Sequence, residues 1–191
     1  MSQIPKIQKG EPTYLQYQKK IVLIKTIIFF VISLGVFLLG YLLTKTKSNL
    51  LTIVAVFLML PSSKSLVSYI MYVRTPKYNE NIIENVQNVI GDVPVLYNLY
   101  LTSYKTNFPL NCIAIRGNNV MGYTEFESCD TTACEEHIQL IAAQNSMKNL
   151  NIKIFKGSEL KNFEERLCQL QTHEAGKKEI ELLELIKDIS L

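Results

Sequence analysis

An uninterrupted apolar run near the start of the chain limits the folds open to it. Residues 26–43 read TIIFFVISLGVFLLGYLL, which is 18 residues without a charged side chain, and the apolar character begins at Ile21. A stretch of this length and composition predicts a helix that spans a membrane. A signal peptide has a shorter apolar core and a small-residue cleavage site, whereas this run leads into TKTKSN and a second apolar run. We therefore expect a first span over about 21–43 that stays in the protein.

The second apolar run predicts a partner for this helix. Residues 50–60 (LLTIVAVFLML) are short for a span, and they reach spanning length only by continuing through PSSKSLVSYIMYV to residue 73. Two interpretations stay open: a span over about 50–73, or a span that ends near Ser63 with the rest lying in the membrane interface. In both, the chain begins with an α-helical membrane hairpin, and the lipid bilayer is its first expected partner.

Positive charge gives the hairpin an expected orientation. Five lysines precede the first span and basic residues follow the second, whereas the turn between them carries Lys45 and Lys47. The flanks that are richer in positive charge stay in the cytoplasm. We expect a multi-pass protein of the cell membrane, with both termini in the cytoplasm and the turn near residues 45–49 outside.

The balance of charge changes sign at about residue 78. Residues 1–78 carry ten Lys and Arg and one acid, giving +9, whereas residues 79–191 carry ten Lys and Arg and sixteen acids, giving −6. This predicts a basic membrane anchor over 1–78 and a cytoplasmic domain over 79–191. An acidic domain argues against nucleic acid as a partner, because such binding needs a positive surface. The four cysteines all lie in the acidic part and should be thiols in that compartment.

The acidic part predicts a small α/β or α+β domain. Apolar periodicity and turn residues indicate a short helix that stops at Gly91, a strand over 94–103, and a hairpin of LNCIAIR and VMGYTEF. A helix over about 133–145, a strand at NIKIF and two closing helices follow. Thr132 and Glu135 have the spacing of a capping box for the middle helix. The expected order is helix, three strands, helix, strand, helix, helix.

This order of elements resembles the core of the restriction-endonuclease-like superfamily, whose enzymes are the PD-(D/E)XK nucleases. In that family a metal-binding aspartate lies at the second strand and a (D/E)-x-K signature on the third. Here LNCIAIR has no acid, and TEFES offers Glu125 and Glu127 with no lysine two positions on. The resemblance implies a nuclease-like fold that lacks the catalytic motif. The chain also resembles small membrane proteins of Gram-positive, low-GC bacteria in which two helices precede such a domain.

Two glutamates are the candidate catalytic residues. Glu125 and Glu127 are two apart on the expected strand, so both would point to one face and could hold a metal ion. The alternative is a solvated face, because paired acids are common on protein surfaces. With no lysine, histidine or third acid at a known spacing, we expect the solvated face.

Two cysteines and a histidine are the candidate metal ligands. Cys129, Cys134 and His137 are the residue types that zinc prefers, but C-x4-C-x2-H lacks the paired C-x2-C geometry. Cys134 also lies on an apolar helical stripe, where a buried thiol is the ordinary explanation. We expect scaffolding here, with no metal and no other cofactor.

The closing helix is the candidate partner-binding element. Its apolar surface is wider than a simple stripe, so it is either buried on its own domain or docks a partner. The candidate partner-binding residues are Ile180, Leu183, Ile186 and Ile189. No G-x-S-x-G, P-loop or G-x-G-x-x-G occurs, so no motif indicates a serine hydrolase, a P-loop NTPase or a dinucleotide-binding enzyme.

Three functions follow from these observations. The preferred one is a membrane-anchored, non-catalytic interaction or regulatory module, as a subunit of a larger membrane complex. The second is a sensor and effector of bacterial defence, whose soluble domain gates an oligomeric membrane pore. The third is a membrane-tethered nuclease that uses Glu125 and Glu127. The first two imply a protein partner or a homo-oligomer.

Overall fold

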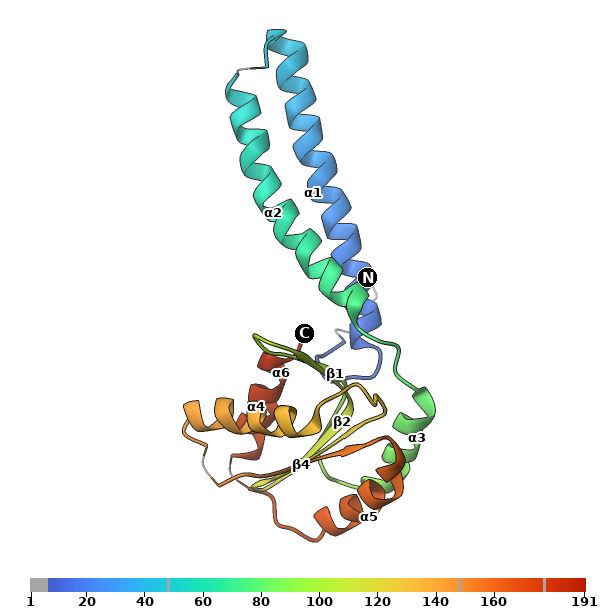
Figure 1. Cartoon of the computed structure of the whole chain (residues 1–191). Helices are drawn as coiled ribbons and strands as arrows, with labels where there is room; N and C mark the ends of the chain where they lie inside the picture. Colours follow the sequence, from blue (N-terminus) through green and yellow to red (C-terminus); the bar gives the residue numbers. More distant parts are fainter. Residues whose placement is uncertain (1–6, 48, 148, 177) are drawn as a thin grey trace, which may run out of the picture. The chain divides into compact units, whose positions relative to one another are not determined.

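The computed structural model describes residues 7–47, 49–147, 149–176 and 178–191, and it divides the chain into two compact units. One unit, the helical hairpin, spans 15–75. The other, the domain, joins 76–191 to the N-terminal segment that ends at Tyr14 (Figure 1). The sequence placed a single boundary between anchor and domain at residue 78. Residues 7–14 instead belong to the domain, because they hydrogen-bond to it. Residues 1–6 of the expected anchor and Ser48 of the expected turn lie outside the described residues.

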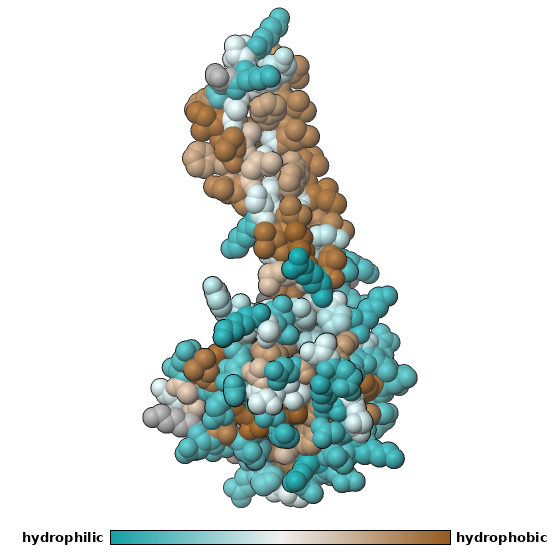
Figure 2. Space-filling view, in the orientation of Figure 1, coloured by the Kyte–Doolittle hydropathy of each residue, from teal (hydrophilic) through white to brown (hydrophobic). Residues whose placement is uncertain are grey.

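Two long helices, α1 (Tyr14–Thr44) and α2 (Leu50–Arg74), make up the hairpin. Both are long and apolar enough to cross a membrane, and α2 continues as a helix through Pro61. In each helix only 11% of the most apolar window is buried, so most of its apolar side chains lie on the surface of the hairpin. Figure 2 shows the resulting apolar surface on the helices and hydrophilic atoms at their turn.

Small side chains line the contact between α1 and α2. Thr26, Ser33 and Gly40 recur every seven residues on α1 and are buried, a spacing that keeps them on one face. The Oγ1 of Thr26 lies 2.8 Å from the Oγ of Ser65, and the Ser33 hydroxyl donates to the Ala55 carbonyl at 2.9 Å. Small residues allow close approach of the backbones, and these hydroxyl groups find partners inside the hairpin.

The domain is built on a four-stranded sheet in the order β1-β2-β3-β4. Its strands are β1 (Val95–Thr102), β2 (Asn107–Arg116), β3 (Asn119–Thr124) and β4 (Asn151–Lys156). The first three form an antiparallel meander, and β4 pairs parallel to β3. Helix α4 (Thr131–Gln144) supplies the crossover that a parallel pair requires.

Helices cover both faces of the sheet (Figure 1). On one face α4 and α6 (Glu179–Ile189) enclose a core that includes Ile113 and Ile115 of β2. On the other, α3 (Glu80–Val89) and α5 (Leu160–Leu170) enclose a core that includes Cys112 and Ala114. Alternate residues of the central strand therefore feed two cores. A short turn of 3-10 helix (Gly157–Glu159) precedes α5, and the order of helices and strands agrees with the expected one.

Helix α4 begins two residues earlier than expected and has a different cap. The side chain of Asp130, rather than Thr132, accepts the Ala133 N–H at 3.0 Å. Glu135, the expected second half of a capping box, accepts the Ile154 N–H of β4 at 2.8 Å instead. The capping-box prediction was wrong because aspartate is itself a strong N-cap and a tertiary contact occupies the glutamate.

Candidate functional site

The segment that leads into α1 is fixed to the outer edge of β1. The Gly10 carbonyl accepts the Tyr97 N–H at 2.7 Å, and the Pro12 carbonyl accepts the Asn98 side-chain amide at 2.7 Å. Glycine is required at position 10, because its φ is 95° and a Cβ there would lie 2.5 Å from the Cδ2 of Leu96. This segment is therefore part of the domain.

Asn98 departs from strand geometry at this contact. Its φ is 49°, in the left-handed region that asparagine enters more readily than other residues with a side chain. Its Oδ1 is buried and has no hydrogen-bond partner among the described residues. A backbone of this kind costs about 1–3 kcal/mol and persists where its surroundings fix it. Here the contact with Pro12 contributes to fixing it.

The segment that follows α2 is fixed to the same strand. The Tyr78 hydroxyl donates to the Leu99 carbonyl at 2.7 Å, and its ring packs edge-on against Phe126 with centroids 5.5 Å apart. Burial raises the pKa of Tyr78 far above its ordinary value, so the hydroxyl remains a donor at physiological pH. The next N–H, of Asn79, donates to the Oε1 of Glu125 at 2.9 Å.

The C-terminal residues cover the remainder of this edge. Ser190 pairs with Leu101 in an isolated bridge, and the Leu191 N–H donates to the Tyr100 carbonyl at 2.9 Å. The ammonium group of Lys9 donates to the Ser190 carbonyl at 2.7 Å. Both connections to the helices thus meet three consecutive residues of β1. We call this group the connection site; it comprises Gly10, Pro12, Tyr78, Tyr97, Asn98 and Leu99.

On the opposite edge of the sheet, backbone N–H groups of β4 donate to carboxylates. The Ile154 N–H donates to Glu135, as described, and the Lys156 N–H donates to the Oε2 of Glu159 at 3.2 Å. Exposed strand edges are templates for pairing with other chains. Because both edges have partners at these positions, the domain does not present a bare strand there.

Glu125, a candidate catalytic residue, makes hydrogen bonds within the fold. The strand β3 ends at Thr124, so the expected placement of the two glutamates on it was wrong. Asn111 is fully buried, donates to the Oε1 of Glu125 at 2.7 Å, and accepts the Glu125 N–H at 2.9 Å. With the bond from Asn79, this carboxylate joins the start of α3 to β2.

Glu127 lies in different surroundings. It is exposed, and its Oε2 lies 3.6 Å from the Nζ of Lys156. A surface pair of this kind contributes little to stability. The two glutamates therefore have separate partners, and Glu125 makes its contacts within the fold.

The candidate metal ligands take part in packing. Cys129 and Cys134 are buried, and burial raises the pKa of both thiols. The His137 ring packs against Phe108 with centroids 5.8 Å apart. Within the described ranges, no three His, Cys, Asp or Glu side chains are grouped so that they could hold a metal ion.

The four candidate partner-binding residues of α6 differ in how far they are buried. Ile186 is fully buried, and Leu183 and Ile189 are half-buried against the same core. Ile180 is 73% exposed. Of the four residues, three therefore pack on the domain and one remains open to a partner.

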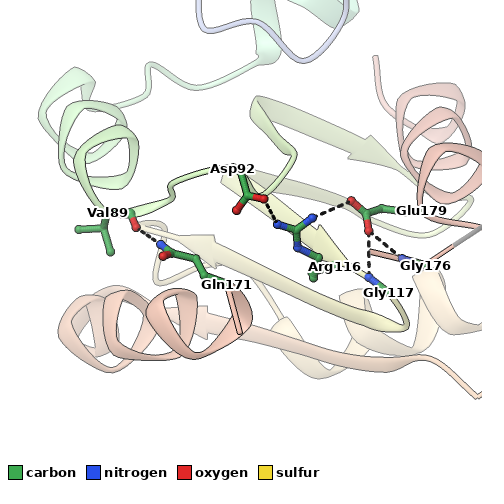
Figure 3. A network of polar contacts seen from close by, with 7 residues as sticks. All are labelled: Val89, Asp92, Arg116, Gly117, Gln171, Gly176 and Glu179. Carbon is green, nitrogen blue, oxygen red and sulfur yellow. Dashed lines mark hydrogen bonds and ion pairs between the residues drawn. The ribbon is translucent and has the colours of Figure 1, made fainter. Parts of the chain in front are cut away.

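Sequence reasoning missed a charged network at the end of β2 (Figure 3). Arg116 lies 2.7 Å from the Asp92 carboxylate and 3.9 Å from that of Glu179. Arg116 and Glu179 are 8% and 7% exposed, whereas Asp92 is 80% exposed. Glu179 also accepts the N–H groups of Gly117 and Gly176 at 3.1 and 3.2 Å. The contact with Arg116 lowers the pKa of Asp92.

Two neighbouring contacts close this end of the domain. The side-chain amide of Gln171, after α5, donates to the Val89 carbonyl at the end of α3 (Figure 3). Gly176 lies so close to Gly117 that a Cβ would stand 2.8 Å from the Gly117 Cα. The ion pairs of Arg116 join β2 to the segment after α3 and to α6, and the Gln171 bond joins the end of α5 to α3. The buried groups of the network therefore stabilise the fold.

Comparison with known proteins adds no relative to this picture. No family model, no curated protein and no solved structure matches the chain. The contacts described above therefore carry the functional argument, and a nuclease-like fold stays a prediction from the order of elements.

Proposed function

We propose that the chain is a membrane-anchored, non-catalytic interaction or regulatory module of the cell membrane. In this proposal α1 and α2 cross the bilayer, and both termini and the domain lie in the cytoplasm. The open apolar side chains of both helices and the basic residues that flank them support the anchor. The acidic domain then offers its surface to a protein partner or to further copies of the chain.

The observation that carries the proposal is the connection site. A simple tether would leave the linking segments unpaired, whereas here Gly10, Pro12 and Tyr78 are each hydrogen-bonded to β1. Because both connections end on one strand, a shift of either helix acts on the same part of the sheet. A partner that changes the sheet acts on both helices by the same route, since coupling between sites is reciprocal.

The use of the candidate catalytic groups supports a non-catalytic role. Glu125 is held by Asn79 and Asn111, and Arg116 is held by Asp92 and Glu179. The buried thiols have raised pKa values and so lack the thiolate that a nucleophile needs. Glu125 and Arg116 thus bind the protein's own groups, and the buried thiols Cys112 and Cys134 stay protonated.

The test is purification of the full chain from its native membrane in mild detergent, followed by native mass spectrometry. A module of a complex gives a second protein in fixed ratio. A homo-oligomer alone would favour the second function, a sensor and effector that gates a membrane pore, which a membrane-leakage assay tests. Turnover of a substrate by the purified chain would overturn the proposal. Gly10→Ala should weaken the complex while the hairpin stays in the membrane, whereas Glu127→Ala is a matched control.

A further inference from the structure

The turn between β1 and β2 carries the most exposed large apolar side chain of the described residues. Tyr104 has a relative exposure of 103%, and Lys105 beside it is exposed. The turn itself is ordered by two hydrogen bonds, from the Ser103 N–H to the Thr106 carbonyl at 3.0 Å and from the Thr106 N–H to the Ser103 hydroxyl at 3.3 Å. A fixed turn therefore presents an aromatic ring and a cation to the surroundings.

This turn ends the strand that carries the connection site. Tyr104 follows Leu99 by five residues and lies two residues beyond Thr102, the last residue of β1. The turn, the segment 7–14 and the C-terminal residues gather at one end of the domain (Figure 1). The turn is thus near the points at which the domain meets its connections.

The direction of the N-terminal segment agrees with this placement. Gly10 contacts Tyr97 and Pro12 contacts Asn98, so the segment advances along β1 toward the turn. Helix α1 begins at Tyr14, two residues beyond Pro12. The last residues of the domain before α1 therefore lie toward the turn end of β1.

The chemistry of the turn fits a lipid headgroup layer. Tyrosine is enriched at membrane interfaces because its ring is apolar and its hydroxyl is polar. Lysine places an apolar stem in the same layer and its ammonium group among anionic headgroups. The neighbours Ser103 and Thr106 add neither an acid nor a bulky group that would oppose the contact.

We propose that Tyr104 and Lys105 form a second membrane contact, which rests the domain on the headgroup layer of the bilayer that holds α1 and α2. The inference rests on the membrane anchor of the proposed function and adds a lipid surface as a partner of the domain.

The absence of tryptophan from the sequence allows a direct test. Tyr104→Trp places a single fluorescent probe in the turn of the full chain, which is reconstituted in phosphatidylcholine vesicles with and without phosphatidylglycerol. Ile180→Trp and Leu140→Trp are matched controls, because these positions are 73% and 59% exposed and lie on other elements. Quenching is measured with headgroup nitroxide lipids and with acrylamide in the water phase.

A membrane contact predicts opposite behaviour of the probe and the controls. The probe at position 104 should be quenched by the nitroxide lipids at least about threefold more than the control probes, and correspondingly less by acrylamide. Adding Lys105→Glu should reduce this difference in the anionic vesicles. Acrylamide quenching at position 104 as strong as at position 180 would overturn the inference. Protection of position 104 from acrylamide without quenching by the lipids would also overturn it, because it would indicate a protein contact.

Flotation of the same vesicles separates this inference from the proposed function. A chain that floats with the vesicles after an alkaline wash, but whose probe at position 104 stays in water, overturns the second contact and keeps the anchor. A chain that the wash removes overturns the anchor, and the second contact with it.

Discussion

Asn79 and Glu125 are joined by a hydrogen bond of 2.9 Å from a backbone N–H to a carboxylate oxygen. The bond links the residue that caps α3 to the loop that follows β3, 46 residues later in the chain. The same oxygen accepts a bond from buried Asn111. The glutamate that sequence reasoning ranks as a catalytic candidate thus helps to hold the connection that follows α2.

Replacement of Glu125 should therefore destabilise the domain. Glu125→Ala removes the one carboxylate oxygen that accepts two hydrogen bonds and leaves the buried Asn111 NH₂ group without that acceptor, so we expect a loss of about 2–3 kcal/mol in the free energy of unfolding. Glu127→Ala, at an exposed position, should change it by less than about 0.5 kcal/mol. Urea unfolding of the full chain in mild detergent, followed by tyrosine fluorescence, measures both. Equal effects of the two substitutions would contradict this role.

The N-terminal connection should loosen when Gly10 acquires a side chain. Gly10→Ala forces a left-handed conformation on alanine and places its Cβ against Leu96, at a cost of about 1–2 kcal/mol. Trypsin cleavage after Lys9 should then accelerate about tenfold, because cleavage follows the open population. Gly35→Ala is the matched control, since a Cβ at position 35 meets nothing within 4 Å. An unchanged cleavage rate for Gly10→Ala would count against the contact with β1.

The four thiols should differ in reactivity. Cys168 is exposed, whereas Cys112, Cys129 and Cys134 are buried and have raised pKa values. A raised pKa keeps a thiol protonated at a pH where an ordinary thiol, of pKa about 8.5, ionises. At pH 8 we expect one label per native chain and four after unfolding, counted by intact mass. A second native label would contradict this, and its loss on addition of zinc would revive the metal hypothesis.

Loss of Arg116 should leave a buried carboxylate without its counter-ion. We expect Arg116→Met to lower the free energy of unfolding by about 3–5 kcal/mol. The double substitution with Glu179→Gln should recover a large part of that loss, because the amide keeps an acceptor for the Gly117 and Gly176 N–H groups. Additive effects of the two substitutions would show that the pair does not interact.

The lowered pKa of Asp92 predicts the pH range in which this network loses stability. Its folded-state pKa lies below the ordinary value of 3.8 because Arg116 donates to it. A lowered carboxyl pKa gives stability above the unfolded-state pKa, and that stability is lost as the pH falls through the folded-state pKa. We expect the chain to lose stability below about pH 4, and Asp92→Asn to lose less over the same range. Identical acid profiles would contradict the assignment.

The elements that the sequence predicts well are those set by local periodicity. Phe163, Leu167 and Leu170 recur on one stripe of α5 and are all fully buried, and α3 ends just before Gly91, the expected stop. The uncharged run and its successor become two long helices. Such patterns can be read from the sequence because they depend on residues only three or four positions apart.

The contacts that define the candidate site join residues far apart in the chain. Pro12 and Asn98 are separated by 86 residues, and Lys9 and Ser190 by 181. No spacing rule links such pairs, although a polar Asn98 inside an apolar strand is a local sign that this position differs from its neighbours. Glu125 resembled a catalytic residue for the same reason, because its partner Asn111 lies across a hairpin.

Thiol labelling from the two sides of intact cells tests the membrane anchor most directly. Lys47→Cys places a thiol in the turn between α1 and α2, and native Cys168 reports on the domain. With a membrane-impermeant maleimide, a hairpin with a cytoplasmic domain predicts labelling at position 47 in intact cells and at Cys168 only after permeabilisation. Labelling of Cys168 in intact cells, or none at position 47 until the membrane is opened, would contradict the proposed anchor.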